Sequence, residues 1–234
     1  LRDEAGNVLY EGAFQEGLYD GTGRLYADNA LVYEGEFAQG LYDGEGKLYE
    51  GGQLVYEGDF AAGQRTGQGK AYEDGALVYE GGFQDGLYSG SGRLYYADGT
   101  VRAECATFAD GLIDGACVLY YENGQTKYEG TFSQGEASGQ GTLYAEDGTR
   151  TYYGGFEAGL KSGTGTDYYP SGAKEYEGAF SQGVYDGEGA LYNEDGTLRY
   201  QGGFSQGVYS GAGALYLEGG ARVEGTFAAG AVTG

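Results

Sequence analysis

Residues 10–17 read Tyr10-Glu11-Gly12-Ala13-Phe14-Gln15-Glu16-Gly17, and the 234-residue chain repeats this motif along its whole length. A glycine follows three residues after each phenylalanine, and another follows after seven, from Gly21 in the first copy to Gly234 in the last. Self-similarity at a period of 23 to 25 residues is typical of a repeat array, not of an ordinary globular domain. All ten phenylalanines stand in this frame and are the expected structural core: Phe14, Phe37, Phe60, Phe83, Phe108, Phe132, Phe156, Phe180, Phe204 and Phe227.

Tyrosines occupy two further positions of the frame. Eight repeats open on a tyrosine: Tyr10, Tyr33, Tyr56, Tyr79, Tyr128, Tyr152, Tyr176 and Tyr200. A second tyrosine follows twelve residues after each of the first nine phenylalanines: Tyr26, Tyr49, Tyr72, Tyr95, Tyr120, Tyr144, Tyr168, Tyr192 and Tyr216. We expect both sets to share the packed face with the phenylalanines, because rings of this size supply the burial that an array needs.

Composition limits the architecture. Glycine contributes 51 residues and proline one, which is too much glycine for a helical protein and lacks the every-third spacing of collagen. An aromatic content of 15% argues against a disordered glycine-rich linker.

Each repeat predicts two short strands. The first is Tyr-Glu-Gly-x-Phe, and the second runs from the Gly-x-Gly pair through Leu-Tyr. A connection of constant length, such as residues 17–21, joins them, and glycines facing each ring let it lie flat on the neighbouring backbone. The predicted fold is therefore all-β: one elongated, solenoid-like antiparallel sheet of stacked β-hairpins, continuous over residues 1–234.

Repeat length varies only between the second tyrosine and the next opening position. Turns absorb insertions and packed strands do not, so this interval predicts the other hairpin turn. In the longer repeats the sequence favours type I′ turns there, because Asn-Gly and Asp-Gly tolerate positive φ. The pairs are Asp98-Gly99, Asn123-Gly124, Asp147-Gly148, Ser171-Gly172 and Asp195-Gly196.

The fifth repeat departs from the frame. Glu104, Cys105, Ala106 and Cys117 stand where other copies have Tyr, Glu, Gly and Gly. We expect an irregularity or kink at 100–120, between 1–103 and 104–234. The two cysteines are expected on opposite faces of neighbouring strands, which disfavours a disulfide and leaves the redox compartment undetermined.

The formal net charge of −23 argues against nucleic acid and disfavours docking on anionic membranes. The sequence contains no signal-peptide region and no apolar run long enough for a transmembrane helix, and it identifies no compartment. The chain opens inside one repeat and closes inside another, so it reads as a piece of a longer protein.

Catalytic constellations are not apparent. Without histidine, no Ser–His or Cys–His pair can form. Two carboxylates of a carbohydrate-active enzyme are an alternative, but the glutamates recur periodically and are expected to form a solvated sheet face. They are Glu11, Glu34, Glu57, Glu80, Glu129 and Glu177. The Asp-Gly turns lack a calcium-loop pattern, so we expect no enzyme activity, cofactor or metal.

Five tyrosines are predicted to bind a partner, because they fall five residues after their phenylalanine, inside the constant connection: Tyr19, Tyr42, Tyr88, Tyr185 and Tyr209. A row of tyrosines along one edge, beside acidic residues such as Asp20, is a suitable contact stripe. The alternative is that they only cap the sheet edge. Replacing all five by serine is expected to abolish partner binding and leave the fold intact.

The pattern Tyr-x-Gly-x-Phe-x-x-Gly-x-x-x-Gly-x-Gly, seen for example in residues 33–46, resembles the MORN (membrane occupation and recognition nexus) repeat over essentially the whole chain. The resemblance implies an elongated sheet of hairpins that accompanies catalytic or anchoring domains. It associates the chain with membrane apposition, lipid binding, scaffolding and self-association, and it implies no catalytic residues.

The expected function is a non-enzymatic structural or protein-interaction module, a rigid acidic β-ribbon that holds protein partners or copies of itself. The alternative is a membrane- or lipid-associated adaptor attached to other domains, which the family resemblance favours and the net charge disfavours.

Overall fold

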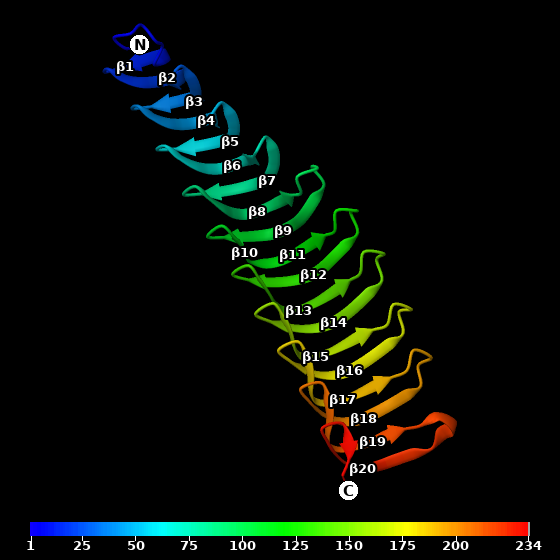
Figure 1. The fold of residues 1–234 in the computed structure, drawn as a ribbon. Coiled ribbons are helices and arrows are strands. Elements are labelled where there is room, and N and C mark those ends of the chain that lie inside the picture. The colour runs from blue at the N-terminus through cyan, green and yellow to red at the C-terminus, as the bar shows by residue number, and fades with distance from the viewer. Residues whose placement is uncertain (234) are drawn as a thin grey trace. The chain divides into compact units, whose positions relative to one another are not determined.

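The computed structural model describes residues 1–233, so Gly234, the last glycine of the frame, lies outside the described residues. The chain divides into two compact units, unit 1 (Leu1–Ile113) and unit 2 (Asp114–Gly234). In each unit the hairpins follow one another in chain order as an antiparallel sheet (Figure 1). The predicted all-β class of stacked antiparallel hairpins is confirmed.

Unit 1 pairs each strand with the next in the sequence. Residues 1–9 precede the first strand and are fastened by the bridge between Arg2 and Val8. The strands are β1 (Tyr10–Gln15), β2 (Leu18–Ala27), β3 (Ala30–Ala38), β4 (Leu41–Glu50), β5 (Gln53–Ala61), β6 (Gln64–Glu73), β7 (Ala76–Gln84), β8 (Leu87–Tyr95), β9 (Val101–Ala109) and β10 (Leu112–Ile113).

Unit 2 has the same order. Its strands are β11 (Gly115–Tyr120), β12 (Thr126–Ser133), β13 (Glu136–Tyr144), β14 (Arg150–Glu157), β15 (Leu160–Tyr168), β16 (Lys174–Ser181), β17 (Val184–Tyr192), β18 (Leu198–Ser205), β19 (Val208–Tyr216), β20 (Arg222–Ala228) and β21 (Ala231–Val232). The 3-10 turn η1 (Glu218–Gly220) joins β19 to β20 and is the only helical element in residues 1–233.

The connection inside each repeat is a two-residue turn. Glu16 and Gly17 have φ values of 53° and 82°, the pair of positive angles that a type I′ hairpin requires. The expected five-residue connection over residues 17–21 is therefore wrong, because β2 begins at Leu18. The positions that follow this turn belong to a strand.

The connection between repeats has two forms. In the short repeats it is again a two-residue turn, and Asp28 and Asn29 both have positive φ. In the longer repeats only the glycine does: Gly99 has a φ of 86° and its N–H donates to Tyr96 O at 2.9 Å, while Asp98 stays at negative φ. The insertions lie in turns as predicted, but the expected type I′ geometry of Asp98-Gly99 and its equivalents is wrong.

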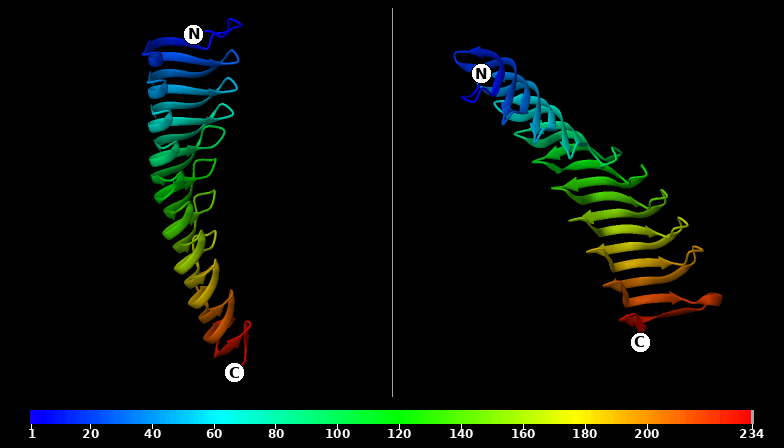
Figure 2. Two further views of the ribbon diagram at one scale, coloured as in Figure 1. Left: turned by 90° about the vertical axis from the view of Figure 1, so that its left-hand side faces the viewer. Right: turned by 45° about the horizontal axis from the view of Figure 1, so that its top comes forward.

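A bulge bends the second strand of each hairpin. The register passes from Gly12↔Gly23 to Phe14↔Tyr19, so three residues of β2 oppose Ala13 alone. Gly21 lies within this bulge at a φ of 71°, a conformation that favours glycine. The second glycine of the frame therefore bends the strand, and Figure 2 shows the strands curled, not flat.

The opening tyrosines form the centre of the core. Tyr33 is fully buried, and its hydroxyl donates to Glu36 O at 2.9 Å. Its ring lies on Gly35 and Gly46, where an added Cβ would come within 2.6 and 2.2 Å of the Tyr33 hydroxyl oxygen. This confirms the prediction that paired glycines let a ring lie flat on the backbone.

Nine of the ten phenylalanines are buried, and each packs edge-on between opening tyrosines where these are present. Phe37, for example, contacts the rings of both Tyr10 and Tyr33. Phe14 is 48% exposed, since no earlier hairpin covers it.

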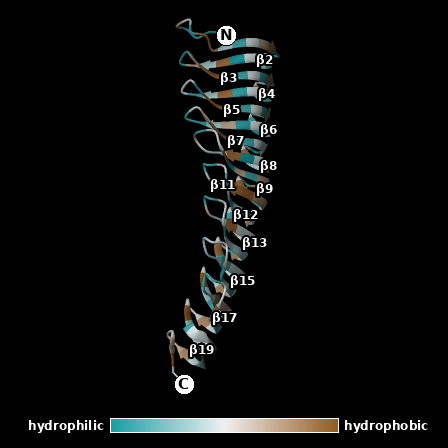
Figure 3. Cartoon of the chain, turned by 90° about the vertical axis from the view of Figure 1, so that its right-hand side faces the viewer, coloured by the Kyte–Doolittle hydropathy of each residue, from teal (hydrophilic) through white to brown (hydrophobic). Residues whose placement is uncertain are grey.

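The second tyrosines lie on the other face. Leu25 pairs with Tyr10 and Tyr33 on the aromatic face, so its neighbour Tyr26 points to the opposite one, where its hydroxyl donates to Glu11 at 2.9 Å. The expectation that this set shares the packed face is wrong, because strand alternation gives the core position to the preceding residue. Figure 3 shows the resulting bands of hydrophobic and hydrophilic residues on the strands.

Candidate functional site

The five predicted contact tyrosines stack on the opening tyrosines. Their ring centroids lie 3.7 to 3.9 Å apart, in the pairs Tyr10–Tyr19, Tyr33–Tyr42, Tyr79–Tyr88, Tyr176–Tyr185 and Tyr200–Tyr209. Each also meets flanking phenylalanines edge-on, as Tyr42 meets Phe37 and Phe60. One ring face is therefore part of the core, and the five side chains are half-buried.

This packing changes what their substitution would do. Aromatic pairs in such geometry contribute about 0.5–1.5 kcal/mol beyond the area that they bury. Serine at these positions would remove the stack, so we now expect the serine variant to lose stability as well as any surface contact. Phenylalanine, which keeps the ring and removes only the hydroxyl, separates a surface role from the packing role.

Other repeats place a different side chain on the same ring. Arg65 lies with its guanidinium carbon 5.5 Å from the Tyr56 centroid, and Lys161 places its ammonium 4.6 Å from the centroid of Tyr152. The frame position five residues after phenylalanine is thus either aromatic or cationic in seven of the nine complete repeats. Both kinds of side chain bind the face of a tyrosine ring.

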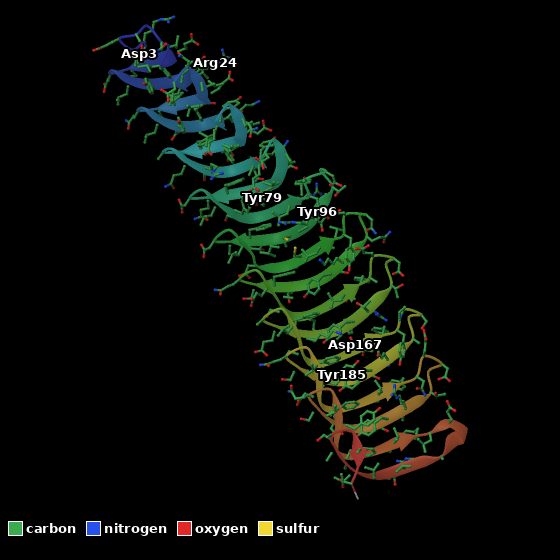
Figure 4. All side chains as sticks on the ribbon, in the orientation of Figure 1. Asp3, Arg24, Tyr79, Tyr96, Asp167 and Tyr185 are labelled. Carbon is green, nitrogen blue, oxygen red and sulfur yellow. The ribbon has the colours of Figure 1, made fainter. Side chains whose placement is uncertain are left out.

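Repeat seven contains a charged cluster within the aromatic face of unit 2. Asp167 stands where other repeats have leucine, only 9% exposed, and it forms an ion pair with Lys161. Burial, with the negative charge of Asp167, raises the pKa of Tyr185, which lies nearby (Figure 4). The cation over Tyr152 therefore has a carboxylate partner in its own repeat.

The opposite face of unit 1 carries a ladder of alternating charge. The residues that pair across successive strands are Glu11, Arg24, Glu34, Lys47, Glu57, Lys70, Glu80, Arg93 and Glu104. The Arg24–Glu34 and Arg93–Glu104 bridges measure 2.6 and 2.7 Å, and their side chains are 39–56% exposed. Pairs this exposed add little stability, about 0–1 kcal/mol each.

The second tyrosines border this ladder. Tyr72 donates to Glu57 at 2.7 Å, and that hydrogen bond lowers the pKa of Glu57. Burial and the same carboxylate raise the pKa of Tyr72 to about 12. The ladder is therefore a hydrogen-bonded, partly covered surface, and a shallow open groove lined by Glu34, Glu57 and Glu80 runs along it.

Unit 2 lacks the ladder. The equivalent row contains no basic residue and reads Val118, Glu129, Thr142, Tyr153, Thr166, Glu177, Ala190, Gln201, Ala214 and Glu224. Tyr153 is 50% exposed there. In neither unit do three or more metal-binding side chains gather within the described residues.

Sequence reasoning missed an exposed aliphatic row along the edge formed by the turns inside each repeat, such as Glu16-Gly17; this edge is called the tight-turn edge below. It lies four residues after phenylalanine, and its members are 37–51% exposed: Leu18, Leu41, Leu87 and Leu112 in unit 1, and Leu160, Val184 and Val208 in unit 2. Gln64 and Glu136 interrupt it. The sequence contained the signal, since seven of the nine complete repeats have leucine or valine four residues after the phenylalanine.

The fifth repeat replaces a ring by smaller groups. Ala103 pairs with Leu94, so it and not Glu104 occupies the opening position, fully buried. Cys105 pairs with Gly92 as Gly35 pairs with Gly23, and Cys117 pairs with Gly130 as Gly141 pairs with Gly154. The two cysteines thus stand at the positions of the paired glycines that lie beneath an opening tyrosine in other repeats. The expected assignment was one residue off, because Ala106 and Thr107 form a bulge between Cys105 and Phe108.

Neither cysteine is a free thiol, since the structure assigns both Cys105 and Cys117 to the disulfide-bonded state. The expectation that a disulfide is disfavoured is therefore wrong. Its basis was the misplaced frame, which set the two residues on opposite faces.

Burial raises the pKa of the opening tyrosines, as for Tyr56, Tyr79, Tyr128, Tyr152 and Tyr176, each to about 12. Each of these hydroxyls donates to the backbone carbonyl three residues on, so they stay protonated as hydrogen-bond donors. A perturbed pKa that recurs with the repeat indicates packing and not a single catalytic group.

In the described part of the chain, no helix has the length and apolar character needed to cross a membrane. A comparison with curated proteins found no match. A family model of the MORN repeat matches nine segments: residues 10–30, 33–52, 56–76, 79–101, 105–126, 128–150, 152–174, 176–198 and 200–222. Because these matches cover most of the chain and follow the hairpins described above, the chain belongs to the MORN-repeat family.

Proposed function

We propose that this chain is a non-enzymatic scaffold that binds protein partners through the tight-turn edges of its hairpins. The carrying observation is the exposed aliphatic row, which brings Leu41 and its equivalents beside the half-buried tyrosines of the same strands. Exposed apolar side chains in rows mark interaction surfaces, and tyrosine adds apolar area with a polar tip.

The regular spacing supports a scaffold role. Neighbouring strands lie about 4.8 Å apart, so successive members of the row recur about every 10 Å, at every second strand. The stacked rings beneath them hold these positions in place within each unit. A partner with apolar groups at the same interval, or a second copy of the chain, would be held at several points at once.

Binding to a membrane is the competing function. The aliphatic row would favour insertion, but the net charge of −23 opposes approach to anionic lipid. MORN repeats serve both protein and membrane interactions, so the family does not decide between them. Catalysis has less support, because the raised pKa values of the opening tyrosines recur with the repeat, as packing positions do.

The test substitutes the row and leaves the stack untouched. Leu18, Leu41 and Leu87 changed together to glutamine should abolish capture of protein partners and self-association in sedimentation velocity. Gln64→Ser, in the same row at a polar position, is the matched control and should change neither. Unchanged association of the triple variant, or pelleting of the wild-type protein with neutral and anionic vesicles in moderate salt, would contradict the proposal.

A further inference from the structure

The third repeat departs from the frame at two positions that both lie against the opening tyrosine Tyr56. Arg65 replaces the stacking tyrosine, and Ala71 replaces the leucine that pairs with opening tyrosines elsewhere. Ala71 pairs with Tyr56 on one side and Tyr79 on the other, in the middle of unit 1. Both changes remove bulk from the aromatic face at the same hairpin.

A furrow of about 710 Å³ lies at this place. Its apolar lining includes Leu48, Val55 and Val78, and Arg65 and Tyr88 stand within it. Three acidic residues also line it, all exposed: Glu50, Glu73 and Asp74. The furrow therefore offers apolar surface, one cation and several anions to a single ligand.

Arg65 is the one cation among the residues that line the furrow. It is half-buried between aromatic rings, with its guanidinium carbon 5.5 Å from the centroid of Tyr56 and 6.0 Å from that of Phe83. Within residues 1–233 its guanidinium makes neither a hydrogen bond nor an ion pair. A guanidinium carries five N–H donors in a planar fork that matches a carboxylate.

Repeat seven shows the same arrangement with the partner present. Lys161 occupies the position of Arg65 and lies over Tyr152. Asp167 occupies the position of Ala71 and forms an ion pair with that lysine. The fold thus accepts a carboxylate at this point of the aromatic face, and repeat three has an alanine methyl there instead.

We propose that the furrow of repeat three binds a partner polypeptide through a carboxylate side chain flanked by basic residues. The carboxylate pairs with Arg65 in the space that the Asp167 side chain fills in repeat seven. The basic residues that flank this carboxylate meet Glu50, Glu73 and Asp74. The apolar part of the partner segment covers Leu48 and Val78. A purely anionic amphiphile would be repelled by the three acidic residues, which is why a polypeptide fits better.

This inference rests on the proposed scaffold function and names the chemistry of one partner segment. The test uses the whole chain and the probe acetyl-Lys-Leu-Glu-Leu-Lys-amide, followed by NMR of the arginine Nε–H signals. We expect the Arg65 signal to shift with a dissociation constant of about 1 mM, since one charge-assisted contact with modest apolar burial supports about that affinity. The glutamine analogue of the probe should bind at least about tenfold more weakly.

Two reciprocal variants decide the mechanism. Ala71→Asp supplies the internal carboxylate of repeat seven and should abolish probe binding while keeping the fold. Asp167→Ala frees Lys161 and should create a second, weaker site in unit 2. Arg65→Gln should lose the site, and far-ultraviolet circular dichroism checks that each variant is folded.

Equal binding of the glutamate and glutamine probes, or unchanged binding by Ala71→Asp, would overturn the proposal. Hexanoate that binds as well as the peptide would overturn the assignment of a polypeptide. The Ala71→Asp variant keeps the aliphatic row, so partner capture that persists without probe binding leaves the scaffold function standing. If the row variant still captures partners while the wild-type chain binds the probe through Arg65, the scaffold proposal fails and the furrow assignment stands.

Discussion

The paired glycines beneath each opening tyrosine give the sharpest stability prediction. A Cβ added at Gly46 would meet the hydroxyl oxygen of Tyr33 at 2.2 Å and two of its ring carbons at 2.4 and 2.5 Å. The backbone of Gly46 itself needs no positive φ, and the three atoms nearest to the added Cβ all belong to Tyr33. In Gly46→Ala the ring must leave its place or push the two strands apart.

The magnitude follows from the burial of that ring. Overpacking of a filled core costs about 1–3 kcal/mol, occasionally more. Tyr33 is fully buried and donates to Glu36 O, so its displacement should bring Gly46→Ala to the upper end of that range. Tyr33→Ala alone should cost about 3–5 kcal/mol, as other large aromatic truncations do.

The double variant tests the cause. Once Tyr33 is alanine, the three atoms nearest to the Cβ at position 46 are gone, and Gly46→Ala should be neutral or stabilising by up to about 1 kcal/mol through the unfolded chain. The two substitutions should therefore couple by about 3–4 kcal/mol in urea unfolding followed by circular dichroism. Repeat five already shows this combination, with Ala103 at the opening position and cysteines at both glycine positions.

The coupling would be refuted by additivity. If Gly46→Ala costs the same in both backgrounds, within about 0.5 kcal/mol, the ring is not what the glycine accommodates. The urea m-value must stay unchanged for the comparison to hold, because a repeat array can lose all-or-none unfolding.

Three further predictions concern the same packing. Phe37→Ala should lower the free energy of unfolding by about 3–5 kcal/mol. Phe14→Ala should lower it by less than half of that, because Phe14 is already 48% exposed. Equal losses for the two variants in urea titrations would contradict this reasoning. Burial raises the pKa of Tyr79 to about 12 from 10.0, so its contribution is full below pH 10 and is lost as the pH rises toward 12. Tyrosinate absorbance and circular dichroism should then change together in alkali, and ionisation that precedes unfolding would contradict this. Neither Cys105 nor Cys117 should react with a maleimide until a reductant is added, as mass spectrometry would show; labelling of the untreated protein would disprove the bonded state.

Much of the fold was predictable because the frame repeats. The interval of the phenylalanines gave the hairpin as the unit, and the variable interval located one set of turns. The glycines of the Gly35 and Gly46 type predicted a ring lying on the backbone. These inferences need only composition and spacing, which a periodic chain presents many times.

The faces were harder to predict. The bulge at Gly21 places three residues of β2 opposite one residue of β1, and no spacing in the sequence predicts such a change of register. Strand β2 also begins directly after Gly17, so Tyr19 lies in a strand where a loop was expected. Consequently the contact tyrosines lie on the core rings, and the second tyrosines lie among the glutamates.

The departures from the frame become intelligible only through this bulged register. It brings the residues five and eleven positions after a phenylalanine onto one opening tyrosine, as Lys161 and Asp167 lie at Tyr152. A change at one position therefore alters the space or the charge available at the other. Lys161 has Asp167 as its counter-charge, whereas Arg65 has only the methyl of Ala71 in that place. Five other repeats place a tyrosine on this ring and repeat seven places a lysine with its own carboxylate, so the third repeat is where a cation lies on the aromatic face without a carboxylate at the neighbouring frame position.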